Sequence, residues 1–503
     1  MTASRTGAMM GGVPAADLRS RQWSMLVGGE LRPAGDRATC AVRAPATGEL
    51  LAEVPDATTD DVDAAVAAAD RAAAEWRAVP VRQRAAALRS VAALLRRHRD
   101  ELGWLDALDT GNPVTAMRGD VDLAVDLIEH YADWSLALSG SSLPGDGDHL
   151  HYTVRQPFGV VGRIVPYNHP LMFSASRLAA PLLAGNTVVM KAPDQAPLSA
   201  LRLGELVGEA LPPGTVSFLS GAGSRVGPAL VGHPSVRRVA FTGSVGTGQA
   251  VLQAAAAAGI KTVTLELGGK NPMLVLPDAT PAEAAAGAVV GMNFHWTGGQ
   301  SCGSTSRLLV HRRLVDEVVE AVVDGARRVV VGDPLEAATE MGSMITPEHR
   351  DRVLGYIDHG RAEGLRLATG GGVPAGVPAA GAFVEPTVFV GVPPTSRLWR
   401  KEIFGPVLVV TPFDDDDLAV RMINDGRLGL TASIWTNDLS RAHRLAAAVE
   451  AGYVWVNTAS RHFVGMPFGG VKDSGMGREE SVEEVWSFTE TKAVTVRLGP
   501  AAP

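Results

Sequence analysis

Short apolar runs alternate with helical segments between residues 159 and 267, and this alternation constrains the fold more than any other feature. Each run has the length of a buried strand, and the stretches between the runs have helical spacing. Strands separated by helices pair through crossover connections, so the strands lie parallel and helices cover both faces of the sheet. The expected strands are residues 159–165, 187–190, 215–219, 236–241 and 263–267. The pattern therefore predicts a doubly wound α/β domain of the Rossmann type.

The chain before this domain is predicted to be mainly helical. Residues 1–20 are small and polar and are expected to form a flexible tail. Residues 25–31 are expected to form a hairpin with Gly28 and Gly29 at its turn. The expected helices are residues 58–79, capped by Thr59, a second around residues 88–95, and a third that begins after Pro113.

The second half of the chain repeats the alternation with different loops, from about residue 271 to residue 472. Its expected strands are residues 273–276, 307–310, 407–411 and 453–456. This repetition predicts a second α/β domain. Four aspartates, residues 414–417, open a helix there, where negative charge suits the helix dipole, and they are expected to be solvated rather than to bind a metal.

Two segments alternate in polarity like exposed strands, residues 149–155 and residues 488–498. They are predicted to pair as a protruding two-stranded arm, whose exposed edges invite a partner chain and so indicate a homo-oligomer, either a dimer or a tetramer. The predicted domains are a tail (1–20), a dinucleotide-binding domain (21–138 and 157–268), a catalytic domain (269–478) and an oligomerisation arm (139–156 and 479–503).

Composition excludes several classes of protein. A net charge of −8 without a basic block argues against nucleic acid as the main partner. No apolar run is long enough to span a membrane, and the first residues lack the apolar core of a secretory signal. Two cysteines, Cys40 and Cys302, make no disulfide framework, and no Cys/His spacing suggests a metal site such as that of zinc alcohol dehydrogenases. We therefore expect a cytoplasmic protein without a metal.

Cys302 lies in a setting unlike that of a buried structural cysteine. Glycine and serine residues surround it in the stretch from Thr297 to Ser304, and apolar runs precede and follow that stretch. A cysteine in such a flexible junction can be approached closely by a substrate. Cys302 is therefore a candidate nucleophile, whereas Cys40 is expected to be a small core residue.

Glycine-rich turns and polar residues gather at the carboxyl ends of the first domain's strands. The turns, residues 221–227 and 243–248, can present backbone N–H groups to a pyrophosphate, although neither has the usual G-x-G-x-x-G spacing. Asn168, Lys191 and Glu266 each stand at the end of a predicted strand, where ligands bind in such sheets. A salt bridge between Glu266 and a lysine such as Lys270 is the structural alternative.

Two segments together resemble a known family. Glu266-Leu-Gly-Gly-Lys270 is followed 36 positions after its glutamate by Gly299-Gln-Ser-Cys302, as in the paired active-site signatures of the aldehyde dehydrogenase superfamily. The resemblance covers residues from about 25 to 495 and implies that this chain has the fold of that family. Further matching motifs are Pro166-Tyr-Asn-His-Pro170, Phe241-Thr-Gly-Ser244, Glu402-Ile-Phe-Gly-Pro406 and Pro467-Phe-Gly-Gly-Val-Lys472-Asp-Ser-Gly475.

The resemblance implies NAD(P)-dependent oxidation of an aldehyde by a hydrolytic mechanism. The thiolate of Cys302 would form a thiohemiacetal and then a thioester, and Glu266 would activate the hydrolytic water. The Asn168 side chain and the Cys302 backbone N–H would hold the oxyanion. Lys191, which would also bind the adenosine ribose, completes the implied catalytic set.

The resemblance also implies a cofactor site. Asp194 stands where members that use NAD usually have glutamate, and its carboxylate would repel a 2′-phosphate, so NAD is favoured although NADP remains possible. Glu402 would hold the nicotinamide ribose. The implied cofactor residues are Ile164, Pro166, Tyr167, Lys191, Asp194, Gly223, Phe241, Gly243, Ser244, Thr247, Leu267, Glu402 and Phe404.

The implied substrate pocket departs from the family at His169 and Ser176, where aromatic or aliphatic residues are common. An aldehyde with a medium-sized apolar or aromatic body is expected, although His169 and Arg461 could equally be hydrogen-bonded scaffold. The implied pocket residues are His169, Met172, Phe173, Ser176, Trp296, Ser301, Phe463 and Phe468, with Arg461 and His462 near the mouth.

Two other interpretations stay open within the same superfamily. In a CoA-acylating relative, CoA would release the acyl group, but such relatives commonly lack the glutamate that Glu266 supplies. A catalytically silent relative would keep the fold and tends to lose the nucleophile or the cofactor residues, which this chain retains.

Overall fold

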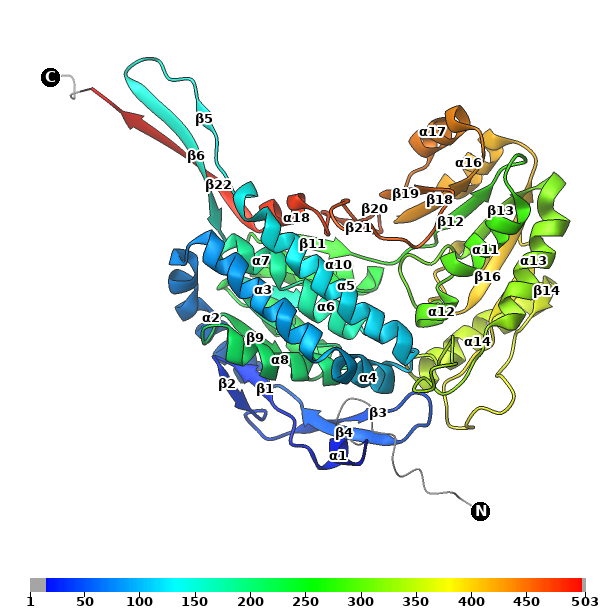
Figure 1. Ribbon diagram of the computed structural model, residues 1–503, viewed down its shortest axis with the longest axis horizontal. Coiled ribbons are helices and arrows are strands. Elements are labelled where there is room, and N and C mark those ends of the chain that lie inside the picture. Colours follow the sequence, from blue (N-terminus) through cyan, green and yellow to red (C-terminus); the bar gives the residue numbers. More distant parts are fainter. Residues whose placement is uncertain (1–14, 500–503) are drawn as a thin grey trace.

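The computed structural model describes residues 15–499, which form two α/β lobes and a protruding arm (Figure 1). One lobe is built mainly from the first half of the chain and the other from residues after 270, and the arm extends from the first lobe. The predicted α/β class, with two α/β domains and a β arm, is confirmed.

The first lobe contains an eight-stranded sheet of order β2-β1-β9-β8-β7-β10-β11-β21. Its five central strands, β9 to β11 in that order, are parallel, as the alternation predicts, and antiparallel strands close both edges. The strands are β1 (Met25–Val27), β2 (Glu30–Arg32), β7 (Val160–Ile164), β8 (Thr187–Lys191), β9 (Val216–Leu219), β10 (Val236–Thr242), β11 (Thr262–Glu266) and β21 (Gly475–Met476). The edge strand β21 comes from the range assigned to the catalytic domain, so this range contributes to both lobes.

Helices cover both faces of this sheet because successive strand residues point to opposite sides. Val188 and Met190 pack with α3, α5, α7 and α8, whereas Val189 packs with α2, α9 and α10. The helices are α2 (Thr59–Ala78), α3 (Val81–Arg97), α4 (Arg99–Thr110), α5 (Val114–Asp133), α6 (Pro170–Ser176), α7 (Ala179–Ala184), α8 (Leu198–Ala210), α9 (Gly223–Gly232) and α10 (Val245–Ala258).

The N-terminal part of the described chain differs from the prediction in three places. A short helix, α1 (Ala15–Ser20), occupies residues expected in the flexible tail, and residues 1–14 lie outside the described range. Thr58, not Thr59, caps α2, because its side chain accepts the Asp61 N–H while the Asp61 carboxylate accepts the Thr58 N–H. Helix α4 was not predicted. The hairpin β3 (Thr39–Arg43) and β4 (Leu50–Pro55) precedes α2.

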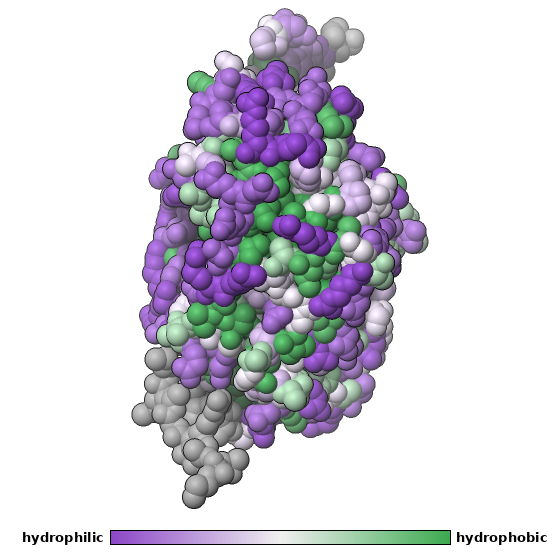
Figure 2. All heavy atoms as spheres, turned by 90° about the vertical axis from the view of Figure 1, so that its right-hand side faces the viewer, coloured by the Kyte–Doolittle hydropathy of each residue, from purple (hydrophilic) through white to green (hydrophobic). Residues whose placement is uncertain are grey.

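The second lobe contains a seven-stranded sheet of order β14-β15-β16-β13-β12-β18-β19, parallel except for β14. The face of this lobe that is turned to the viewer in Figure 2 mixes hydrophilic residues with patches of hydrophobic ones. The strands are β12 (Pro272–Val275), β13 (Arg307–His311), β14 (Arg366–Thr369), β15 (Thr387–Val390), β16 (Val407–Phe413), β18 (Thr431–Trp435) and β19 (Tyr453–Val456). The helices are α11 (Pro281–Gly291), α12 (Phe294–Thr297), α13 (Val315–Arg328), α14 (Pro347–Ala362), α15 (Arg397–Arg400), α16 (Asp416–Asn424) and α17 (Leu439–Ala448).

The aspartate run before α16 is used by the fold. Asp415 caps the helix by accepting the Leu418 N–H, and Asp416 pairs with Arg441 and Arg444. Asp414 pairs with Arg312. Each of these carboxylates therefore has a structural partner.

The arm has three strands rather than the predicted two. β6 (His149–Pro157) pairs along its whole length with β22 (Thr489–Arg497), and β5 (Ser142–Leu143) adds to the other edge of β6. Residues 479–488, assigned to the arm by sequence, instead pack into the first lobe through α18 (Val482–Ser487). A small pair, β17 (Leu428–Gly429) and β20 (Val471–Lys472), and the short 3-10 helices at Trp134–Ala137 and Arg312–Leu314 complete the structure. Among residues 15–499, no helix is long and apolar enough to cross a membrane.

Candidate active site

Two cavities meet at Cys302. The larger has a volume of about 640 Å³ and runs along the carboxyl ends of the first lobe's strands, and the smaller has a volume of about 50 Å³. Four residues line both cavities: Phe173, Thr242, Glu266 and Cys302. The structure thus brings the predicted nucleophile and the predicted base to one shared wall.

The loop that carries Cys302 is shaped by its glycines and by one asparagine. Gly298 and Gly299 follow α12 with φ values of +58° and +76°, a conformation that suits glycine. The Asn271 side chain donates to the carbonyl of Cys302 at 2.6 Å and to that of Ser304 at 3.0 Å. A Cβ at residue 269 would lie 2.7 Å from the Cys302 carbonyl oxygen, so Gly269 permits the close packing of the two signature segments.

Cys302 is a neutral thiol in this arrangement. Burial, together with the nearby carboxylates of Glu266 and Glu402, raises its pKa to about 12, while the N–H of Gly303 opposes them. The thiolate is the reactive form, so the site needs a base or a bound positive charge to generate it.

Glu266 stands at the end of β11 with both carboxyl oxygens buried and without hydrogen-bond partners among residues 15–499. Burial raises the pKa of this carboxyl well above its usual range, and the charge of Glu479 adds to the effect. The alternative salt bridge to Lys270 is not formed, since the Lys270 Nζ also has no hydrogen-bond partner in the described chain. A buried, unpartnered acid with a raised pKa beside a cysteine is a candidate general base.

The segment that carries Asn168 is held by α4 and by the loop between α4 and α5. Asn112 donates to the Asn168 carbonyl at 3.0 Å, and the N–H of Leu171 donates to Asp106 at 3.1 Å. The Asn168 side chain is 4% exposed, lines the larger cavity, and makes no hydrogen bond to the described residues. Its amide is therefore free to donate to a ligand.

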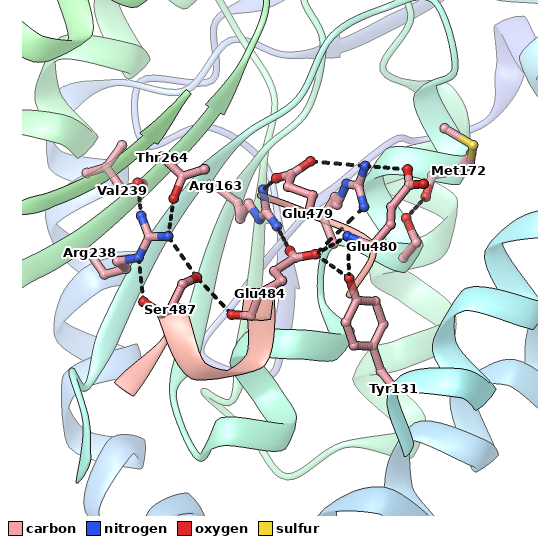
Figure 3. Close-up of polar contacts among 12 residues, drawn as sticks. Tyr131, Arg163, Met172, Arg238, Val239, Thr264, Glu479, Glu480, Glu484 and Ser487 are labelled. Atoms are coloured by element: carbon pink, nitrogen blue, oxygen red, sulfur yellow. Dashed lines mark hydrogen bonds and ion pairs between the residues drawn. The ribbon is translucent and has the colours of Figure 1, made fainter. Parts of the chain in front are cut away.

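Figure 3 shows a buried ionic network that contains Glu479, the residue whose charge acts on Glu266. Arg163 pairs with Glu479 at 2.5 Å and with Glu484 at 2.6 Å, and Tyr131 donates to Glu484. Arg177 pairs with Glu479 at 3.0 Å. The network fixes Glu479, whose charge acts on Glu266, through Arg163 of β7 and Arg177, which follows α6.

One end of the larger cavity brings together Lys191, Asp194 and Gly223. The Lys191 ammonium pairs with Asp194, and the other oxygen of Asp194 accepts the Gly223 N–H at 2.7 Å. Ser244 begins α10, and its side chain accepts the Thr247 N–H. This end offers the N-terminus of α10 and a carboxylate next to a close backbone turn.

The other end of the larger cavity contains Glu402 and Phe404. Glu402 accepts the Gly269 N–H at 2.9 Å, and burial raises the pKa of its carboxyl to about 7. Phe404 has a positive φ of 58°, unusual outside glycine, and His349 donates to its carbonyl at 2.7 Å. Burial lowers the His349 pKa to about 4, so His349 is neutral and its Nε2–H is the donor.

All thirteen residues predicted to bind the cofactor line the larger cavity. The smaller cavity is lined by six of the eight predicted substrate residues: His169, Met172, Phe173, Trp296, Ser301 and Phe468, together with His462.

The structure does not bring Ser176, Phe463 or Arg461 to the smaller cavity. Ser176 is 1% exposed and turns back to donate to the Met172 carbonyl at 2.6 Å. Phe463 is 48% exposed, and the Arg461 guanidinium lies 5.1 Å from its ring centre. Both loop residues therefore stack on each other outside the cavity.

Several cavity residues were missed from sequence. Arg177, Glu479 and Glu480 line the smaller cavity, and Asp120 lies behind it. A charged residue within a helical stretch is usually solvated, so its spacing in the sequence does not indicate that it is buried. Its burial becomes visible only when the fold brings distant segments together. Arg352, from α14, lines the larger cavity, and no sequence motif indicated that it would do so. Among residues 15–499, no cluster of three or more His, Cys, Asp or Glu side chains is arranged to hold a metal ion.

The chain belongs to the aldehyde dehydrogenase family, which matches residues 32–494. The aldehyde dehydrogenase tropH of Talaromyces stipitatus is 45% identical over 468 residues, which cover 91% of this chain and 90% of that protein. A betaine aldehyde dehydrogenase of Sinorhizobium fredii is 42% identical over 458 residues, 90% of this chain and 93% of that protein.

Solved structures agree in fold. The NAD+ complex of an aldehyde dehydrogenase from Bacillus cereus has a TM-score of 0.93 at 38% identity and covers 96% of this chain and 98% of that one. PnpE from Pseudomonas sp. WBC-3 in complex with nicotinamide adenine dinucleotide has the same TM-score at 37% identity, covering 96% and 99%. The family's fold therefore extends over nearly the whole chain.

Proposed function

We propose that this protein oxidises an aldehyde to the carboxylic acid with NAD, through a covalent intermediate on Cys302. The observation that carries the proposal is the shared wall: Cys302 and Glu266 line both the long cavity and the small one. One cavity is shaped for a dinucleotide and the other for a small substrate, so an aldehyde carbon at the wall would face thiol, acid and cofactor together.

The larger cavity suits NAD. The N-terminus of α10 and the carboxylate of Asp194 offer groups for a pyrophosphate and a ribose. Lys191 and Asp194 would hold the adenosine ribose, Ser244 would lie at the pyrophosphate, and Glu402 would hold the nicotinamide ribose. When bound, NAD supplies the acceptor for a hydride.

The first chemical step creates the nucleophile. Glu266 is the carboxylate that lines both cavities, and in its ionised form it accepts the Cys302 proton. The sulfur then attacks the aldehyde carbon, and the carbonyl electrons move to oxygen. The Asn168 amide and the Cys302 backbone N–H donate to this oxyanion, which gives a tetrahedral thiohemiacetal.

The second part releases the acid. The oxyanion re-forms its carbonyl as the hydride leaves the same carbon, and a thioester on Cys302 remains. Glu266 first releases the Cys302 proton to solvent and then takes a proton from water. The resulting hydroxide attacks the thioester, the carbon–sulfur bond breaks to give the acid and the thiolate, and Glu266 returns its proton to the sulfur. The presence of Glu266 at this place supports hydrolysis rather than transfer to CoA.

We further propose NAD in preference to NADP. Asp194 already pairs with Lys191, and its side chain is 44% exposed toward the cavity end where the adenosine ribose would lie. A 2′-phosphate there would meet a carboxylate of like charge.

The smaller cavity favours a slim substrate over the medium-sized one expected from sequence. A cavity of roughly 150 Å³ holds a benzene ring, and this cavity has about 50 Å³. We therefore propose a short aldehyde chain. The exposed edges of the arm support assembly as a dimer or tetramer, and two unpaired cysteines are consistent with the reducing cytoplasm.

A pair of variants tests the proposal. We expect Cys302→Ala to form no NADH from any aldehyde, because the nucleophile is gone. Glu266→Gln should release a slowed burst of NADH, because Cys302 must lose its proton without this base, and the burst should not exceed one equivalent per site before the enzyme stalls at the thioester. Rapid-mixing absorbance and intact-protein mass spectrometry would read both steps. Steady NADH formation by Cys302→Ala would contradict the mechanism.

A further inference from the structure

A buried acid organises one wall of the smaller cavity. Asp120, on α5, is fully buried, and each of its oxygens accepts one N–H. Trp296 donates its Nε1–H to one oxygen at 2.7 Å, and His169 lies with its Nδ1 2.7 Å from the other. The acid therefore joins three elements, α5, α12 and the start of α6.

This arrangement sets the orientation of the His169 ring. A carboxylate is an acceptor only, so His169 Nδ1 carries the proton that is shared with Asp120. Edge-on contacts with Phe173 and Trp296, at centroid distances of 5.9 and 4.9 Å, hold the ring plane. The second nitrogen, Nε2, then presents a lone pair.

The Nε2 of His169 makes no hydrogen bond to residues 15–499, and the side chain, which is 7% exposed, lines the smaller cavity. A histidine that served only as scaffold would normally bond through both nitrogens, whereas this Nε2 has no partner in the described chain and is not fully buried. His169 instead has one nitrogen anchored and the other facing the cavity.

Most other polar side chains of this cavity are already engaged, and the Ser301 hydroxyl accepts the Gly303 N–H at 3.3 Å. His462 pairs with Glu480 at 2.9 Å, which in turn contacts Arg177 at 3.2 Å. Ser460 donates to the Gly291 carbonyl at 3.3 Å. Apart from the catalytic wall, His169 is thus the polar group best placed to select a substrate.

We propose that His169 recognises a hydroxyl group on the substrate, so that the protein prefers short hydroxyaldehydes. This inference rests on the proposed aldehyde oxidation. A hydroxyl can donate to the Nε2 lone pair. A carboxylate would instead meet Glu266, Glu479 and Glu480, opposed only by Arg177, and the small volume excludes a ring. His169 is a specificity-determining residue, and Asp120 is the residue that positions it.

Isosteric aldehyde pairs test the proposal. Glycolaldehyde and propanal differ by one hydroxyl in place of a methyl group, as do 3-hydroxypropanal and butanal. We expect the wild-type enzyme with NAD to show a kcat/KM for the hydroxylated member at least about tenfold higher, with rates referred to free carbonyl concentration. A wild-type ratio near one would overturn the inference while leaving the proposed function intact. NADH formation from none of the four aldehydes would instead defeat the proposed function.

Variants identify the residue responsible. We expect His169→Phe to bring the ratio close to one, and His169→Gln, which keeps a hydrogen-bonding group, to restore part of it. Asp120→Asn should lower the ratio by less, because the ring stays in place while its tautomer is no longer set. Ser176→Ala, which removes a buried hydroxyl of α6 outside the cavity, is the matched control and should keep the preference. An undiminished ratio in His169→Phe would overturn the assignment. If that variant fails to fold, His169→Gln decides: a ratio below that of the wild type supports the assignment, and a ratio equal to it overturns the assignment.

Discussion

The two cavities that meet at Cys302 are built in different ways. The larger one follows the ends of parallel strands, and its polar groups come largely from the backbone of glycine-rich turns and from residues directly after a strand. The smaller one is assembled from side chains of α5, α6, α12 and the segment before α18. A site made of backbone is set by the fold itself, whereas a site made of side chains can change with single substitutions. Single substitutions in the smaller cavity are therefore expected to alter substrate choice, whereas cofactor use depends mainly on the backbone that forms the larger cavity.

The largest effect is expected from the ionic network behind the smaller cavity. Arg163→Ala leaves Glu479 and Glu484 buried without their main partner, so we expect a loss of about 3–5 kcal/mol in the free energy of unfolding. Arg237→Ala is the control, because Arg237 pairs with Glu490 at the surface and should cost at most about 1 kcal/mol. Urea denaturation of both variants measures the difference, and equal losses would show that the network does not support the site.

Asn168 stands on the boundary between the cavities, and its loss should damage chemistry rather than binding. We expect Asn168→Ala to lower kcat by about 10²–10³-fold, since one oxyanion donor is removed. The KM values for NAD and aldehyde should move much less. Asn112→Ala, which removes the hydrogen bonds to the Asn168 carbonyl and to the Met117 sulfur but leaves the Asn168 amide, should have a smaller effect on kcat. Steady-state kinetics on both variants would separate the roles, and a normal kcat in Asn168→Ala would remove Asn168 from the mechanism.

The shared wall should respond to pH. Burial raises the pKa values of Cys302 and Glu266, so their reactive, deprotonated forms become more populated as pH rises. In the free enzyme, alkylation of Cys302 by iodoacetamide should therefore accelerate about tenfold per pH unit between pH 7 and pH 9. Burial also raises the pKa of Cys40, to about 11, so the measurement belongs in a Cys40→Ser background. A rate independent of pH would mean that the thiolate already forms without cofactor.

The smallest effect is expected at the adenosine end of the larger cavity. Asp194→Asn removes the charge that opposes a 2′-phosphate, so the ratio of kcat/KM for NAD over NADP should fall by about tenfold or less. The KM for aldehyde should stay constant, because Asp194 does not line the smaller cavity. A wild-type preference for NADP would contradict the cofactor assignment.

The same contrast explains what could be predicted from the sequence. The parallel strands and their terminal residues, such as Lys191 and Glu266, follow from local patterns, because period and length identify buried strands and the fold then places their ends together. The packing of helix α4 and the burial of Glu479 depend on contacts between distant segments. The third strand of the arm, Ser142–Leu143, pairs with residues close in sequence, but its two residues are too few to show an alternating pattern. Ser176 and Phe463 do not line the smaller cavity, and neither spacing nor hydrophobicity in the sequence indicates the direction in which a side chain points. Asp120 was missed because an aspartate in a helix is usually solvated.

The pairing of β21 with β11 has a consequence for synthesis of the protein. This short strand, Gly475–Met476, lies beside the end of β11, and the residues around it supply Phe468 and Glu479 to the smaller cavity. Helical and parallel-strand units made earlier can fold as they leave the ribosome. The acid of the active site, however, gains its final surroundings only when residues near 480 have emerged. A nascent chain can therefore acquire its nucleotide-shaped groove well before it can turn over a reactive aldehyde.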